Sequence, residues 1–144
     1  MENIEPILAK VVEKLKQRPE VLAIYLFGSY VKGYAYEGSD LDIGVMPDNR
    51  LLKGGEGFYG LQEDLGSHVS DVTGVIKIDL VVIQNAPVTL QNSIICGRLL
   101  YSRDDDVRME QEFKIQDNYD DLKDYTDLRL KYNVLRAKRN LGLV

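Results

Sequence analysis

The sequence predicts an α/β (α+β) protein in which helices pack on a small β-sheet. Two patterns predict this fold class. Apolar residues recur at helical spacing near both ends of the chain, and short apolar runs bounded by turn residues lie between them. With 144 residues, the chain has the length of one domain with a single core. We therefore expect one domain over residues 1–144, with its core at about 20–102 and a helical segment at 104–140.

The first part of the chain predicts a helix followed by a strand. Apolar residues over 3–17 recur at helical spacing with charged residues between them, and Pro19 ends this pattern. Residues 21–27, VLAIYLF, form a short run of branched and aromatic residues that is typical of a buried strand. Gly28 and Ser29 end that strand, and a short helix or turn is expected directly after them.

The middle of the chain predicts alternating strands and helices. Proline and glycine mark several bounds: Pro47 closes a strand, Pro87 suits the start of a helix, and Gly97 suits its end. The expected elements are a strand at 40–46, a helix at about 58–72, a strand at 75–83, a helix from 87 to about 96 and a short edge strand at 99–102.

The C-terminal segment predicts a helix with a divided charge pattern. Its apolar stripe consists of Leu122, Tyr125, Leu128, Tyr132 and Leu135. Residues 104–127 contain ten acidic and three basic residues, whereas residues 128–144 contain five basic and no acidic residues. Two interpretations stay open. The segment is either a solvated helix whose cations favour the negative end of its dipole, or a docking surface for a partner with complementary charge.

The composition excludes several classes of protein. A net charge of −5 disfavours a nucleic-acid binder, which needs clustered lysine and arginine for phosphate contacts. One cysteine and one histidine exclude a disulfide framework and a Cys/His zinc site; we expect Cys96 in the core at a helix end and His68 as a surface or packing residue. The amphipathic N-terminus is not a signal peptide, and every apolar run is too short to cross a bilayer. We therefore expect a cytoplasmic protein without a membrane or direct nucleic-acid partner.

Two aspartates lie at alternate positions in the second predicted strand. Side chains two residues apart in a strand point to the same face, so Asp40 and Asp42 share one side, with Cα atoms about 6 to 7 Å apart. In the third predicted strand, Asp79 also points away from the apolar face. Neighbouring strands lie roughly 4.8 Å apart, so Asp79 joins the first pair if these two strands are adjacent.

These three carboxylates favour a metal site. Facing carboxylates repel one another, and a divalent cation removes that repulsion. Oxygen ligands without histidine or cysteine suit magnesium or manganese. Two such ions about 3.5 to 4 Å apart form the usual clamp for in-line phosphoryl displacement. The alternative interpretation is that the aspartates are solvated residues on the open face of a half-covered sheet.

The turn at Gly28 and Ser29 is the second candidate element of a site. Backbone N–H groups where a strand meets a helix can converge on a phosphate, while glycine permits close approach and serine adds a hydroxyl donor. Lys32 is close enough in the sequence to add a positive charge near the same phosphates. The alternative is an ordinary turn in which Ser29 caps a helix.

The combined motif resembles the nucleotidyltransferase superfamily of DNA polymerase beta, and more narrowly the minimal nucleotidyltransferase (MNT) family. It consists of Gly28-Ser29, Asp40-Leu41-Asp42 and then Asp79 in a later strand, within a core of about residues 24–83. The resemblance implies a mixed sheet packed with helices. It also implies that Asp40 and Asp42 hold the metals and that Asp79 completes the site and helps to activate the attacking hydroxyl.

The same resemblance implies that Gly28 and Ser29 hold the triphosphate. Members of the family often carry a basic residue directly after Gly-Ser. In this sequence that position holds Tyr30, while Lys32 matches a second basic position. Nearby, Tyr34 and Tyr36 could either stack on a base or simply pack.

The resemblance also implies a function. Small MNT proteins are commonly encoded beside a helical HEPN-domain partner, where they act as antitoxins, and some transfer AMP from ATP to a tyrosine of the HEPN ribonuclease toxin. We therefore expect a Mg²⁺-dependent nucleotidyltransferase antitoxin with two metal ions, ATP as substrate and a HEPN toxin in a hetero-oligomer. Two alternatives stay open: a nucleotidyltransferase acting on a small molecule such as an antibiotic, and an antitoxin that only binds and masks its toxin.

Overall fold

The computed structural model describes residues 3–33, 35, 39–51, 56–72 and 76–143. The predicted α/β fold class is confirmed, and the strand expected at 21–27 has those bounds. The elements are α1 (Glu5–Leu15), β1 (Val21–Phe27), α2 (Ser29–Lys32), β2 (Leu41–Pro47), α3 (Glu56–Val69), β3 (Ile78–Val82), a 3-10 turn (Ile83–Asn85), α4 (Val88–Ile95), β4 (Arg98–Ser102) and α5 (Asp105–Asn140).

The four strands form one mixed sheet in the order β3-β2-β1-β4. β1 runs antiparallel to both of its neighbours, and β2 runs parallel to β3. β4 is an edge strand, as its short length predicts. The mixed sheet that the family resemblance implies is therefore present.

The starts of β2 and β3 lie one and three residues after those expected. β2 begins at Leu41, so Asp40 immediately precedes the strand rather than opening it. β3 begins at Ile78, and residue 75, where the sequence suggested its start, lies outside the described residues. Both starts are set by the first paired residues of β2 and β3. Leu41 pairs with Ile78, and the Leu41 N–H donates to the Lys77 carbonyl at 2.8 Å.

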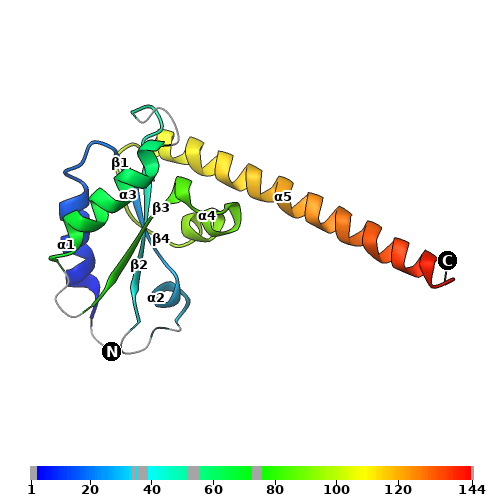
Figure 1. The fold of residues 1–144 in the computed structure, drawn as a ribbon. Helices are drawn as coiled ribbons and strands as arrows, with labels where there is room; N and C mark the ends of the chain where they lie inside the picture. The colour runs from blue at the N-terminus through cyan, green and yellow to red at the C-terminus, as the bar shows by residue number, and fades with distance from the viewer. Residues whose placement is uncertain (1–2, 34, 36–38, 52–55, 73–75, 144) are drawn as a thin grey trace.

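One face of the sheet packs against α1 and α3, which lie together on one side of the strands in Figure 1. The alternate residues of β2, Leu41, Ile43 and Val45, are fully buried on this face. Their partners include Leu8, Val11 and Leu15 of α1 and Leu61, Leu65 and Val69 of α3. The apolar spacing of both helices is thus used to cover one side of the sheet.

The other face is not open, which corrects the expectation of an exposed aspartate side. Beyond Asp42 on this face of β2 come Gly44 and Met46, and Met46 is fully buried. α4 and the first turns of α5 cover them, with Ile94 directly against Gly44. α4 buries its apolar side chains against this face of the sheet. The aspartates therefore lie at the one end of a face that is otherwise closed.

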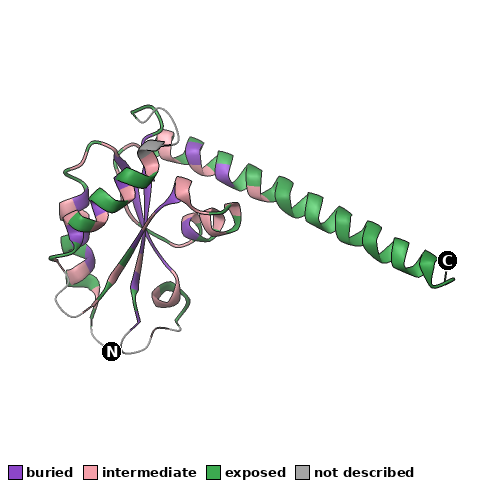
Figure 2. Ribbon diagram, in the orientation of Figure 1, coloured by how far each residue is buried: buried purple, intermediate pink, exposed green. Residues whose placement is uncertain are grey.

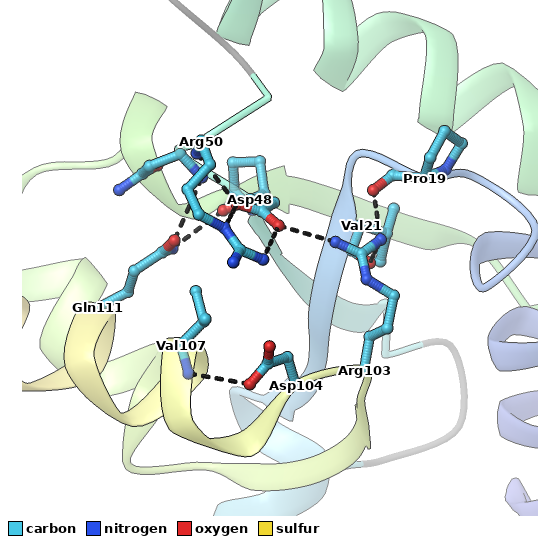
Figure 3. A network of polar contacts seen from close by, with 10 residues as sticks. Pro19, Val21, Asp48, Arg50, Arg103, Asp104, Val107 and Gln111 are labelled. Atoms are coloured by element: carbon cyan, nitrogen blue, oxygen red, sulfur yellow. Dashed lines mark hydrogen bonds and ion pairs between the residues drawn. The ribbon is translucent and has the colours of Figure 1, made fainter.

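A polar network fixes the point where α5 leaves the sheet (Figure 3). The Asp48 carboxylate, at the end of β2, is buried and pairs with the Arg103 guanidinium at 2.9 Å and with Arg50 at 2.7 Å. Gln111 of α5 donates to the Pro47 carbonyl at 2.9 Å, and Asp104 caps the helix by accepting from the Val107 N–H. These bonds hold the base of α5 against the C-terminal end of β2.

The remainder of α5 projects away from the sheet (Figure 1), and its outer part is exposed on every side (Figure 2). Gln111 and Ile115 are its buried residues, and none of the described residues 116–143 is buried. The predicted helix is confirmed, but its apolar stripe contacts no other element. None of the described helices, α5 included, combines the length and apolarity that crossing a bilayer requires.

The lone histidine and the lone cysteine have different environments. His68 lies in α3, and its Nε2 atom is 3.1 Å from the Lys14 carbonyl oxygen of α1, so it helps to join these helices, as expected of a packing residue. Cys96 ends α4 and is exposed, so the expectation of a core cysteine is wrong. The buried residue of that turn is Ile94, which takes the core position against β2.

Candidate active site

The candidate site begins at the sharp turn between β1 and α2. Gly28 has φ 77° and ψ −149°, a conformation that only glycine adopts without strain. Its carbonyl accepts from the Val31 and Lys32 N–H groups at 3.2 and 3.1 Å, so the chain enters the short helix immediately. The turn therefore directs the start of α2 toward the first residues of β2, against which α2 packs.

Gly28 lies directly against the Asp42 carboxylate. The preceding residue, Phe27, is the register partner of Asp42 across the β1–β2 pair. A Cβ atom added at Gly28 would lie 3.0 Å from Asp42 Cγ and would collide with its Oδ2. The glycine thus leaves the space that this carboxylate occupies, and the turn and the aspartate form one continuous surface.

Asp79 lies beside Asp42 on the neighbouring strand. β2 and β3 are parallel and adjacent, and Asp42 and Asp79 are register partners. The adjacency on which the expected geometry depended is therefore present. Asp42 is half-buried, whereas Asp40, just before β2, and Asp79 are exposed.

The electrostatics of the site centre on Asp42. Partial burial is the largest influence and raises the pKa of this carboxyl above its ordinary value. The negative charges of Asp79 and Asp40 raise it further, in that order. Burial and the charges of the two other aspartates therefore both disfavour the ionised form of Asp42.

The donor set fits a hard divalent cation. Carboxylate oxygens without a nearby histidine or cysteine suit Mg²⁺ or Mn²⁺, and a cation beside Asp42 would offset the repulsion that raises its pKa. Within the described residues, no three acidic, histidine or cysteine side chains surround a metal position as they stand. Asp40, Asp42 and Asp79 are the residues that could hold the ion, with Asp42 between the other two.

The remaining predicted residues lie around the turn. Ser29 is half-buried as the first residue of α2, and Lys32 is exposed at its last turn. Tyr34 and Tyr36 lie outside the described residues. Tyr30 packs against the apolar cluster between the sheet and α1, so at this position the chain has a packing residue in place of a basic one.

Sequence reasoning missed how closely the site is bounded. Gly44 and Ile94 meet on the same face of the sheet two residues beyond Asp42, and Gly28 lies directly against the Asp42 carboxylate. The available signal was a glycine within the apolar run at 41–46, since glycine inside a strand often marks a close approach of another element. The resulting site is a strand end against which α2 packs on one side, with Ile94 of α4 covering the strand two residues further along.

The family of the chain follows from a match to a protein-family model. The model described as polymerase beta, nucleotidyltransferase matches residues 9–106, which is more than half of the chain and contains the turn, both strands and all three aspartates. The chain therefore belongs to the polymerase beta nucleotidyltransferase family. No curated protein matches the chain.

Several solved structures with a similar fold are toxin–antitoxin complexes. A toxin–antitoxin with AMP-PNP aligns with a TM-score of 0.59 and 22% identity, over 89% of this chain and 96% of that chain. A tri-AMPylated Shewanella oneidensis HEPN toxin in complex with MNT antitoxin gives 0.58 and 21%, over 89% and 96%. An MntA–HpeT toxin–antitoxin in which two aspartates two positions apart are replaced by glutamates gives 0.60 and 21%, over 88% and 98%. At these identities the likeness establishes the fold.

Proposed function

We propose that this chain is an antitoxin. It transfers AMP from ATP to a tyrosine hydroxyl group of a cognate HEPN ribonuclease toxin and thereby neutralises the toxin. The observation that carries the proposal is the meeting of the Gly28 turn with two carboxylates in register, Asp42 and Asp79. A turn that can receive phosphate beside a cation site is what nucleotidyl transfer requires. Membership of the nucleotidyltransferase family supports the same class of reaction.

The proposed roles follow from position. Asp40 and Asp42 would hold Mg²⁺, with two ions expected, and Asp79 would complete the site. Bound Mg²⁺ would neutralise the triphosphate and stabilise charge on the entering and leaving oxygens. The backbone at Gly28 and Ser29 would hold the triphosphate, with Lys32 adding positive charge from the end of α2.

The reaction itself is an in-line substitution at the α-phosphorus of ATP. The acceptor hydroxyl oxygen forms a bond to this phosphorus, the bond to the bridging oxygen breaks, and pyrophosphate leaves. Asp79, which is exposed and lies next to Asp42, would take the hydroxyl proton. Gly28 leaves the Asp42 carboxylate the space it occupies, because any side chain at position 28 would collide with it.

Two further observations support a protein acceptor. The described residues add to the nucleotidyltransferase core only the long helix α5, and they include no second domain that could hold a bulky small-molecule acceptor. Structures of similar fold are named as toxin–antitoxin complexes, and one of them contains a tri-AMPylated HEPN toxin. Both favour a partner protein of the HEPN class over a small molecule.

The test is the intact mass of the HEPN-domain protein encoded beside this chain, after incubation with the chain, ATP and Mg²⁺. We expect a gain of whole adenylyl units, abolished by Asp42→Asn and preserved in Gly33→Ala, a control next to the site whose added Cβ meets no atom within 4 Å. An unchanged toxin mass in a stable complex that still suppresses the ribonuclease would overturn the proposal in favour of masking. Turnover of a small molecule without any toxin would point to the small-molecule enzyme instead.

A further inference from the structure

The outer part of α5, residues 117–140, carries an apolar surface that nothing in the described chain covers. Four of its large side chains are mostly or substantially exposed: Tyr125 by 61%, Leu128 by 68%, Tyr132 by 63% and Leu135 by 44%. Figure 2 shows the helix beyond residue 119 as exposed throughout. A contiguous apolar patch held out in water marks an interaction surface. The stripe formed by these four residues is called the Tyr/Leu stripe below.

The Tyr/Leu stripe has the spacing of helix-to-helix packing. Its residues follow one another at intervals of three, four and three, so at 3.6 residues per turn they align on one side of the helix. A second set, Leu130, Val134 and Leu141, recurs at four and seven and falls on the opposite side. The helix therefore has one stripe suited to pair with another helix, and a separate apolar face behind it.

The stripe is flanked by opposite charges at equal distances. Asp121 precedes Tyr125 by four residues, and Arg139 follows Leu135 by four residues, both on the same side of the helix as the stripe. Read from either end, the intervals are four, three, four, three and four. Read toward the C-terminus the series begins with the acidic Asp121, and read toward the N-terminus it begins with the basic Arg139.

We propose that the Tyr/Leu stripe is the contact of a homodimer in which α5 helices of two copies pack antiparallel. This arrangement sets Tyr125 against Leu135 and Leu128 against Tyr132 of the second copy, each twice. It also places Asp121 beside Arg139 of the second copy at both ends. Such a surface is self-complementary, which a two-fold contact requires.

The charges beside the stripe favour the same arrangement with one local exception. Asp124 and Lys138 lie along the same flank of the stripe. The antiparallel arrangement therefore brings Asp124 of each copy near Lys138 of the second copy. Near the two-fold axis, Arg129 and Lys131 each approach their own equivalents, which is unfavourable. The ion pairs found within α5 join residues 105–114, and among the described residues Asp121 and Arg139 have no ion-pair partner in their own chain.

The position of α5 makes such a dimer compatible with a working site. The helix leaves from the Asp48 end of β2, whereas the Gly28 turn and Asp42 lie at the other end of that strand. Figure 1 shows α2 and the base of α5 at opposite ends of the sheet. Pairing through the outer part of α5 therefore leaves the candidate active site of both copies uncovered. The inference does not depend on the proposed function.

The first test is the molar mass of the purified chain alone by sedimentation equilibrium. We expect a dimer that Leu128→Asp converts to a monomer. Leu130→Asp is the matched control, since Leu130 is 62% exposed, lies two residues away and faces the opposite side. It should remain dimeric, and circular dichroism should show equal helix content in both variants. A monomeric wild-type chain, or equal loss of the dimer in both variants, would overturn the proposal.

A charge exchange tests the antiparallel register. Asp121→Arg alone and Arg139→Asp alone each turn two ion pairs into two like-charge pairs, so each should raise the dimer Kd by about tenfold. The double variant restores opposite charges across the contact and should recover the wild-type Kd. A double variant as weak as the singles would refute this register. If both charges matter only for binding a HEPN toxin, and not for self-association, the stripe belongs to that partner instead.

Discussion

Gly28 and Asp42 are in direct contact across the β1–β2 pair, where only a glycine leaves room for the carboxylate. We predict that Gly28→Ala moves Asp42 and reduces the rate of nucleotidyl transfer by at least about tenfold. The same variant should also lose about 1–3 kcal/mol of unfolding free energy. Gly33→Ala is the control: with φ 80° and ψ 12° Gly33 lies in the left-handed region, where alanine is less strained than at the φ 77° and ψ −149° of Gly28, and its added Cβ meets no atom within 4 Å. Transfer rates and denaturant unfolding of both variants separate the displacement of Asp42 from a general loss of stability. Equal rates in the two variants would show that the contact has no catalytic consequence.

Asp42→Asn should make the metal-free protein more stable at neutral pH. Burial, Asp79 and Asp40 raise the pKa of Asp42, so its ionised form is disfavoured in the folded state. That unfavourable contribution is present above the raised pKa and disappears as the carboxyl becomes protonated at lower pH. The melting temperature of Asp42→Asn should therefore exceed that of wild type at neutral pH, and the difference should vanish in acid. Added Mg²⁺ should stabilise only the wild type; a variant less stable at neutral pH would contradict this account.

Asp48 should make a pH-dependent contribution of the opposite sign. Hydrogen bonding to Arg50 is the largest influence that lowers its pKa, from 3.8 to about 2, with Arg103 adding to the effect. A depressed carboxyl pKa stabilises the fold fully above 3.8, and this contribution is lost as pH falls through about 2. Asp48→Asn should therefore cost about 2 kcal/mol at neutral pH and much less in strong acid.

Urea denaturation across that pH range measures the Asp48 effect. Asp120→Asn, a replacement of an exposed aspartate on α5, is the matched control and should change stability by less than about 0.5 kcal/mol. A loss at Asp48→Asn that does not change with pH would show that the carboxylate stabilises the base of α5 by some other means than its charge.

Gly44 and Ile94 determine how closely α4 covers the sheet next to the site. A Cβ atom at position 44 would collide with Ile94 Cγ2 and lie 3.5 Å from Ile94 Cβ. Gly44→Ala should therefore destabilise the fold by about 1–3 kcal/mol, because the core must shift to accept the extra atom. The effect should be smaller in an Ile94→Ala background, which a double-mutant cycle on unfolding free energies measures. Additive effects would mean that α4 does not rest on Gly44.

Local patterns predicted the elements well because each has its own signal. The apolar run at 21–27 gave a strand with those bounds, and Pro87 and Gly97 marked the limits of α4 closely. The bounds of β3 were predicted less well because its start depends on pairing with β2. The first hydrogen bond between the two segments runs from the Leu41 N–H to the Lys77 carbonyl. Cys96 was misplaced for a related reason: helix spacing alone does not say which of the last residues of α4 faces the sheet.

The chemistry of the site was predictable in type but not in geometry. Alternation within a strand put Asp40 and Asp42 on one side, yet the register of Asp42 with Asp79 joins residues far apart in the chain. The same holds for the contact of Gly28 with Asp42 and for the cover that Ile94 provides. Both interpretations of the charge pattern of α5 put this helix at the surface, but the apolar stripe alone could not decide between them, since such a stripe predicts a packed helix whether its partner is the same chain or another.

We propose that the Gly28 turn and the three aspartates form one cation-dependent nucleotide site. The most direct test is calorimetric titration of the chain with AMP-PNP, with and without Mg²⁺, in the wild type and in Asp42→Asn. We predict saturable binding that requires Mg²⁺, that is lost in Asp42→Asn and that is kept in Gly33→Ala. Binding of equal strength in Asp42→Asn, or without Mg²⁺, would contradict the account.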